Sequence, residues 1–246
     1  MKRLEKIIQL VSQETRIDVN TLSELLEVSK VTIRKDLDKL ESKGLLHREH
    51  GYAVLNSGDD LNVRLSYNYN LKKQIAQRAL ELIQDNDTIM IESGSTCALL
   101  AEMICQQRRN VRIITNSCFI ANYIRSYDTC SVFLLGGEYQ TNSEVTVGPL
   151  LKEMIRLFHV DKLFVGTDGY DENSGFMCKD LMRCEVVNCM AEHAEELIIL
   201  TDSSKFTKHS LVKQFSLDQV SYVISDAAIP KELKATLADK LLAVSE

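Results

Sequence analysis

Several markers of common protein classes are missing from this sequence. Its 246 residues contain no apolar run that approaches the roughly 18 residues a membrane helix needs. The N-terminal MKRLEKIIQLVSQE mixes charges with its apolar residues and has no small-residue cleavage site, so it is not the pattern of a signal peptide. These absences predict a soluble cytoplasmic protein with no membrane partner.

Paired cysteines are also missing. The seven cysteines lie at positions 97, 105, 118, 130, 178, 184 and 189, scattered through apolar segments and without a C-x-x-C pair. Zinc sites and redox centres usually carry such pairs, whereas buried cysteine serves as a small hydrophobic residue. The sequence therefore predicts reduced core thiols, no metal site and no cofactor.

The chain has no overall excess of positive charge, since its net charge is −6. The charge is divided unevenly, however. Residues 1–56 hold 10 Lys/Arg and 9 Asp/Glu, net +1, whereas residues 57–246 hold 19 and 26, net −7. The length exceeds that of a typical single domain. Together these observations predict two domains with separate functions.

The first segment predicts two short helices. Residues 2–13 place apolar side chains at helical spacing, so one stripe of a first helix is buried. Those side chains are Leu4, Ile7, Ile8 and Val11. Thr21 and Glu24 then form a capping-box pattern, which predicts the start of a second helix at Thr21.

A third helix and a hairpin follow. Ser29 is a good N-cap, and Ile33, Leu37 and Leu40 fall on one face of the helix after it. The run LLHREHGYAVL alternates enough to predict a hairpin, the wing. Such a winged helix-turn-helix places its third helix in a DNA major groove. The geometry alone leaves a small protein-binding module open.

The run VNTLSELLEVSKVTIRKDLDKLESKGLLHREHGYAVL resembles the DNA-binding signature of the DeoR family of bacterial transcriptional regulators. It shares the VS turn, the TIRKDL helix, LESKG and the wing start HREHG, and departs at Tyr52, where a second glycine is common. The resemblance implies binding of double-stranded operator DNA. By position it brings to the DNA Ser29, Lys30, Thr32, Arg34, Lys35, Arg48 and His50.

Among these residues, we expect Arg34 to contact base edges, because its planar fork suits guanine, and Lys35 to hold a phosphate.

Residues 57–69 predict a linker, and a helix is expected near 70–84. Beyond it, six apolar β-rich runs alternate with helical patterns. The runs are 88–92, 111–115, 131–135, 162–166, 197–201 and 222–225. This alternation predicts a Rossmann-like α/β domain with a mostly parallel sheet, and ligands of such sheets bind at the carboxyl ends of the strands.

Polar residues and glycines follow these runs where a ligand would bind. They are Ser93, Gly94, Ser95, Thr96, Asn116, Gly136, Gly137, Asp168, Gly169, Asp171 and Lys205. Small residues at a helix start suit a phosphate, carboxylates accept hydrogen bonds from sugar hydroxyls, and a lysine pairs with phosphate. One such loop is more often an ordinary cap, but several in one sheet favour a ligand crevice.

Residues of about 60–240 resemble the DeoR effector domain and are similar to the ribose-5-phosphate isomerases, whose fold that domain shares. The shared features are the GST loop, the TNS segment, the DGxDE loop, Glu185 and the DxSK motif. The resemblance implies a phosphorylated-sugar site, with Glu185 near the sugar. Specificity is expected from Tyr170, Phe176 and Arg183.

Catalysis is not expected, because the lysine and triple-glycine loop of the isomerases is replaced by NSGFMCKD at 173–180. Losing groups that act on the transition state removes catalysis while sparing affinity. The prediction is a repressor of a carbohydrate-utilisation operon, with a DNA-binding domain at 1–56, a linker at 57–69 and an effector domain at 70–246. A DNA-binding domain of net +1 neutralises few phosphates, so a homo-oligomer, dimer or tetramer, is expected. A constitutive DNA-binding protein whose α/β half only oligomerises remains open.

Overall fold

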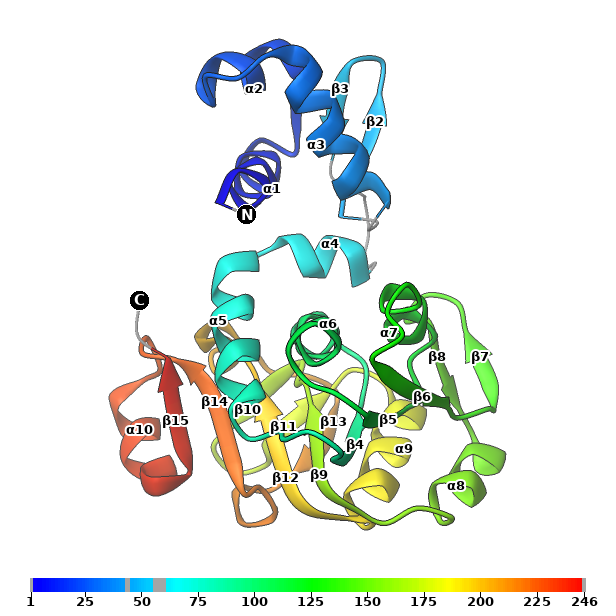
Figure 1. Cartoon of the computed structure of the whole chain (residues 1–246). Helices are drawn as coiled ribbons and strands as arrows, with labels where there is room; N and C mark the ends of the chain where they lie inside the picture. Colours follow the sequence, from blue (N-terminus) through cyan, green and yellow to red (C-terminus); the bar gives the residue numbers. More distant parts are fainter. Residues whose placement is uncertain (1, 43–44, 55–60, 245–246) are drawn as a thin grey trace. The chain divides into compact units, whose positions relative to one another are not determined.

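The computed structural model describes residues 2–42, 45–54 and 61–244 (Figure 1). The chain divides into two compact units, Met1–Asn70 and Leu71–Glu246, called here the head and the body. Residues 55–60, which hold the end of the predicted DNA-binding domain and the start of the predicted linker, lie outside the described residues.

The head is built from short helices around a small antiparallel sheet of order β1-β3-β2. Its elements are α1 (Lys2–Glu14), β1 (Arg16–Asp18), α2 (Val19–Leu25), α3 (Lys30–Ser42), β2 (His47–Glu49), β3 (Tyr52–Val54) and α4 (Leu61–Ser66). Ile33, Leu37 and Leu40 of α3 are buried, as their spacing predicts. On the same helix buried Asp36 accepts a 2.6 Å hydrogen bond from Arg3 Nε, which ties α1 to α3.

The second helix begins earlier than the capping-box pattern predicts. Asp18 is its N-cap, and the Asp18 carboxylate accepts hydrogen bonds from the backbone N–H groups of Asn20 and Thr21. Thr21 therefore lies inside the first turn, and its hydroxyl donates to the same carboxylate. An aspartate is as good a cap as a threonine, so the pattern located the helix but not its first residue.

Helix α4 lies within the segment that was expected to be a linker. Leu61 and Leu65 are buried, and Ser12 Oγ of α1 donates a 3.2 Å hydrogen bond to the carbonyl of Ser66. The two leucines stand four residues apart, which is the spacing of one helix face. This segment therefore differs from the predicted linker by adding a helix to the head.

The body contains a seven-stranded parallel sheet of order β15-β14-β12-β9-β4-β5-β6. Its strands are β4 (Thr88–Ile91), β5 (Val111–Thr115), β6 (Cys130–Leu134), β9 (Val160–Val165), β12 (Ala194–Leu200), β14 (Tyr222–Asp226) and β15 (Leu241–Val244). The chain runs outward from β4 through β5 to β6 and then returns to β9 on the other side of β4. The strand order therefore reverses between β4 and β9, where sheets of this kind bind ligands.

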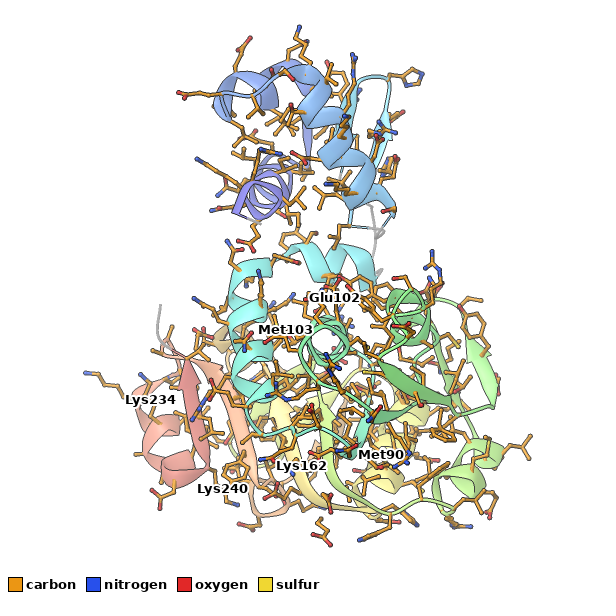
Figure 2. All side chains as sticks on the ribbon, viewed as in Figure 1. Met90, Glu102, Met103, Lys162, Lys234 and Lys240 are labelled. Carbon is orange, nitrogen blue, oxygen red and sulfur yellow. The ribbon has the colours of Figure 1, made fainter. Side chains whose placement is uncertain are left out.

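Helices cover both faces of this sheet, with α5, α6 and α7 on one side and α8 and α9 on the other (Figure 1). The helices of the body are α5 (Tyr69–Leu80), α6 (Ser95–Gln107), α7 (Cys118–Tyr123), α8 (Pro149–Ile155), α9 (Leu181–Ala191) and α10 (Lys231–Leu237), with 3-10 turns η1 (Ser203–Lys205), η2 (Leu217–Gln219) and η3 (Ala238–Lys240). Side chains fill the space between sheet and helices, and Met90 of β4 is fully buried there (Figure 2). Buried Glu102 of α6 accepts hydrogen bonds from the hydroxyls of Tyr123 and Tyr127 (Figure 2).

Two small antiparallel sheets complete the body. The first has the order β10-β11-β13 and the second pairs β7 with β8. Their strands are β7 (Glu138–Gln140), β8 (Val145–Val147), β10 (Gly169–Asp171), β11 (Gly175–Cys178) and β13 (Val212–Phe215). Among the described residues, no helix is long and apolar enough to cross a membrane.

Candidate functional site

The exposed face of α3 carries the basic side chains that the sequence assigned to DNA. Lys30, Arg34 and Lys35 are exposed, and within the described parts of the chain no carboxylate forms an ion pair with Arg34 or Lys35. Ser29 caps the helix by accepting a hydrogen bond from the Thr32 N–H at 3.2 Å. The Ser29 and Thr32 hydroxyls lie 2.9 Å apart, so both are held at the start of the helix.

The wing is fixed to α3 by Arg48. Its guanidinium bonds Asp38 at 2.7 Å and Glu41 at 2.9 Å, and its backbone N–H donates to Glu41 at 2.8 Å. These bonds lower the pKa of Glu41, first through the backbone N–H of Arg48. Arg48 therefore positions the wing relative to the helix.

The tip of the wing is a two-residue turn. His50 and Gly51 have φ values of +48° and +87°, which is the pattern of a type I′ hairpin. The His50 side chain is 88% exposed. Tyr52, the departure from the family signature, lies in β3 with the Arg16 guanidinium 4.0 Å from its ring centroid. This cation–π contact ties the wing to β1, and sequence reasoning missed it.

In the body, the loop after β4 forms the start of α6. Ser93, Ser95 and Thr96 are buried, and Gly94 has a φ of +135°, a conformation that other residues rarely adopt. No side chain caps α6, so the N–H groups of its first turn remain for a ligand. The positive end of the helix dipole adds to their attraction for an anion.

A buried ion network lies beside this loop, where the strand order reverses. Arg183 of α9 bonds Glu92 Oε1 at 3.5 Å and Ser93 Oγ at 3.2 Å, and Asp168, after β9, accepts from the Lys179 N–H at 3.1 Å. Burial lowers the pKa of Arg183, but the charges of Glu92 and Asp168 outweigh it and raise this pKa above its ordinary value. Arg183 is therefore a permanent cation in this region, which is where the sequence predicted a ligand crevice.

Two buried polar atoms of the crevice have no hydrogen-bond partner among the described residues. They are Asn116 Oδ1, at the end of β5, and Arg183 Nε. The amide of Asn116 donates to the Thr146 carbonyl at 3.0 Å, which fixes the side chain. Buried polar atoms are rarely left unpaired. A ligand hydroxyl that donates to Asn116 Oδ1 and a ligand oxygen that accepts from Arg183 Nε would satisfy both atoms.

Several predicted residues have local structural roles. Asp171 accepts from the backbone N–H groups of Asn173 and Ser174 and so closes the β10–β11 turn, bonds that lower its pKa. Exposed Glu185 pairs with Lys152 of α8 at 2.6 Å. The structure therefore does not join Glu185 to the network around Arg183, although both stand on α9.

The predicted glycines differ from one another in their surroundings. A Cβ at Gly137 would lie 2.5 Å from the Val147 carbonyl oxygen, and one at Gly169 would lie 2.3 Å from that of Lys208, so close packing requires both glycines. Gly136 is exposed, and its backbone N–H donates to the Met154 sulfur at 3.3 Å. Half-buried Lys205 stands in η1, just after β12.

Two residues expected to set specificity belong to the core. Tyr170 and Phe176 are buried and pack edge-to-face at 5.4 Å, and each also contacts Phe206. Of the expected specificity residues, Arg183 is the one that lies in the crevice network. Its partner Glu92 is 91 residues away in sequence, and no local pattern links them.

Comparison with known proteins identifies both units. Residues 3–58 match the DeoR-like helix-turn-helix domain, and residues 67–227 match the DeoR C terminal sensor domain. The chain belongs to the DeoR family of transcriptional regulators. The predicted family and the predicted fold class, a helix-turn-helix domain followed by a Rossmann-like α/β domain, are confirmed.

Relatives of this DeoR-family chain are named as regulators of operons. It is 32% identical over 240 residues to the L-fucose operon activator of Haemophilus influenzae, and the aligned residues make up 94% of each chain. It is 31% identical over 237 residues to the putative aga operon transcriptional repressor of Escherichia coli O157:H7, covering 94% of this chain and 88% of that one. These names confirm the prediction of a regulator and not an enzyme.

A solved structure similar to this DeoR-family chain is ribose 5-phosphate isomerase A from Methanocaldococcus jannaschii. The two share 22% identity with a TM-score of 0.42, over 57% of this chain and 56% of the isomerase.

Proposed function

We propose that this DeoR-family regulator represses a carbohydrate-utilisation operon and is released from its operator by a phosphorylated sugar bound in the body. The observation that supports the proposal most strongly is the cluster of buried polar side chains where β4 and β9 end. There the uncapped start of α6 lies beside the Glu92–Arg183–Asp168 network. One side suits a phosphate and the other suits hydroxyl groups.

In this proposal the phosphate lies against the start of α6 and the loop before it, at Ser93, Gly94, Ser95 and Thr96, with Lys205 as its counter-ion. The sugar hydroxyls meet Asn116 and Asp168, whose oxygens accept their hydrogen bonds. Gly136, Gly137, Gly169 and Asp171 shape the loops around the crevice. Glu185, paired with Lys152, is given no role in sugar binding.

A thermal-shift screen tests the effector site. Phosphorylated sugars should raise the unfolding temperature, because ligand at 100 times its Kd adds about 2.7 kcal/mol of stability. The free sugars should have little effect. Lys205→Ala should weaken the response, whereas Lys208→Ala, an exposed lysine of the same loop, should keep it. A panel of sugar phosphates that leaves the unfolding temperature unchanged would contradict the proposal.

On the head, we infer that α3 enters the major groove with Arg34 at a base edge and Lys30 and Lys35 at phosphates. Ser29 and Thr32 would contact the sugar-phosphate backbone of the DNA near the start of α3. The exposed ring of His50 would contact the same DNA backbone from the tip of the wing. Arg48 acts indirectly, since its guanidinium is already bound by Asp38 and Glu41.

Operator titrations separate these roles. Arg34→Ala should cost about 1–3 kcal/mol and relax sequence preference, whereas Lys35→Ala should weaken all sequences alike and reduce the salt slope by about 1. Unchanged affinity and preference in Arg34→Ala would reject the assignment of base contact.

Effector and operator are then combined in one assay. A sugar phosphate that binds the body should change operator affinity by about 5–150-fold, the usual range of coupling between two sites. Binding of the sugar phosphate without any change in operator affinity would favour a constitutive DNA-binding protein. We expect paired heads on a dimer or tetramer, which sedimentation tests. A monomer that binds one half-site tightly would exclude this arrangement.

A further inference from the structure

The end of α9 brings together three metal-ligating side chains that the regulator proposed above does not use. They belong to Cys189, Glu192 and His193, and one ligand atom of each lies within 4.8 Å of the others. Residues at positions i, i+3 and i+4 share one face of a helix. Cys189, Glu192 and His193 have this spacing, so their side chains lie on the same side. The cysteine is buried, the histidine half-buried and the glutamate exposed, so an ion could enter from solvent.

The histidine ring is already oriented for coordination. His193 Nδ1 lies 2.9 Å from the Cys189 carbonyl oxygen. In the tautomer that carries its proton on Nδ1, this bond leaves the lone pair of Nε2 available to a metal. Ligating histidines almost always donate their other ring N–H to a carbonyl or carboxylate in this way.

Charges of both signs lie near Cys189, since Glu192 and Glu153 are negative and Arg156 and Lys152 are positive. Helix α9 ends at Ala191 with Glu192 as its C-cap, and the C-terminal end of a helix carries partial negative charge. The glutamate adds a full negative charge. The Cys189 sulfur lies 4.0 Å from the Lys152 carbonyl oxygen of α8, so a further oxygen faces the ligand group.

We propose that Cys189, Glu192 and His193 bind a divalent transition-metal ion of the zinc type, with water as the fourth ligand. Tetrahedral zinc, with bonds of about 2.0–2.3 Å, places its ligand atoms about 3.3–3.6 Å apart. Side-chain rotation can close the present spacing to this value. Sulfur and imidazole select zinc or cobalt over magnesium and calcium.

The site is separate from the sugar-phosphate crevice. The backbone carbonyl of His193 accepts a 3.0 Å hydrogen bond from the N–H of Val160, the first residue of β9. The predicted crevice lies at the opposite end, where β4 and β9 end. The sequence predicted no metal site because paired cysteines are absent. Here one cysteine is joined by two ligands of other types within a single helical turn.

Binding must displace the thiol proton. A metal bound through the thiolate therefore releases a proton, so affinity should increase with pH.

Cobalt titration of the reduced, chelator-treated full chain tests the site. One Co²⁺ per chain should bind and give a sulfur-to-cobalt charge-transfer band, and Zn²⁺ should remove that band by displacement. Cys189→Ser should abolish the band, and Glu192→Gln and His193→Gln should each weaken Co²⁺ binding at least tenfold.

Matched controls come from the same region. Cys184→Ser removes another buried thiol of α9, which contacts the Lys213 carbonyl, and His159→Gln removes an exposed histidine paired with Glu195. Both should keep the band and the affinity. No band at one equivalent, or the same band in Cys189→Ser, would overturn the proposal. If Cys189→Ser does not fold, unchanged affinity in Glu192→Gln, an exposed position, also overturns it.

Discussion

At the scale of single residues, the cysteines have very different surroundings. Interaction with the Cys105 thiol lowers the pKa of Cys130 to about 7, and the same pairing raises the pKa of buried Cys105. Half-exposed Cys118 is the natural comparison, because burial raises the pKa of its thiol. The thiolate is the reactive form, so Cys130 should react faster than Cys118.

We therefore expect iodoacetamide to label Cys130 fastest of the seven cysteines, with a rate that rises as pH passes through about 7. Mass spectrometry of timed samples measures this rate for each thiol. Cys105→Ala should move the profile toward the ordinary thiol range. Faster labelling of Cys118, or an unaltered profile in Cys105→Ala, would contradict the pairing of Cys105 with Cys130.

Residue by residue, the sequence predicted the positions of the crevice better than their contacts. Ser93 to Thr96 and Asn116 were found because each follows an apolar run, a local signal. The pairing of Arg183 with Glu92 depends on two segments that meet only after folding, and so does the cluster of Tyr170 and Phe176 with Phe206. Side-chain type gives no information about such partners.

At the scale of elements, the N-cap of α2 should make the head sensitive to acid. Hydrogen bonds from Thr21 and Asn20 lower the pKa of Asp18, so their contribution is complete above the ordinary carboxylate pKa and is lost as pH falls through the lowered value. Asparagine also caps helices but does not titrate there. The difference in unfolding temperature between wild type and Asp18→Asn should therefore shift in favour of the variant as pH falls from 7 toward about 3. A constant difference would show that Asp18 does not act through its charge.

Backbone packing makes a second prediction for an element. Gly169 begins β10, and a methyl group there would meet the Lys208 carbonyl oxygen at 2.3 Å, whereas at Gly136 it would meet only Met154 Sδ at 3.6 Å. Gly169→Ala should cost about 1–3 kcal/mol of stability through overpacking. Urea unfolding should show this loss and a much smaller one in Gly136→Ala. Equal losses would mean that the close approach is relieved cheaply.

The six apolar runs predicted as strands all appear in the parallel sheet. Most of them are buried, and buried parallel strands are continuous apolar runs, whereas the edge strand β6 is exposed. The seventh strand, β15, was missed because its apolar run, LLAV, directly follows the 3-10 turn at ADK with no turn residue between them. The short strands β10, β11 and β13 were missed as well. They pair antiparallel outside the main sheet, and three or four residues carry too little pattern to predict this.

At the scale of the whole molecule, the division between Asn70 and Leu71 predicts separable activities. A fragment of residues 71–246 should fold and keep the thermal response to sugar phosphates, because the seven strands and the crevice lie within it. It should not bind operator DNA. Loss of the thermal response in a folded fragment, measured beside the full chain, would place part of the effector site in the head.

Helix α9 runs back along β9, and each end of the helix is fastened to one end of that strand. Just before the helix, the Asp168 carboxylate accepts a hydrogen bond from the Lys179 N–H. Just after it, the Val160 N–H donates to the backbone carbonyl of His193. Because both ends of the helix are hydrogen-bonded in this way, we expect that neither end unfolds without the other. Amide hydrogens along Leu181–Ala191 should consequently exchange with deuterium as one cooperative unit, slowed to the same degree whichever end of the helix is stabilised.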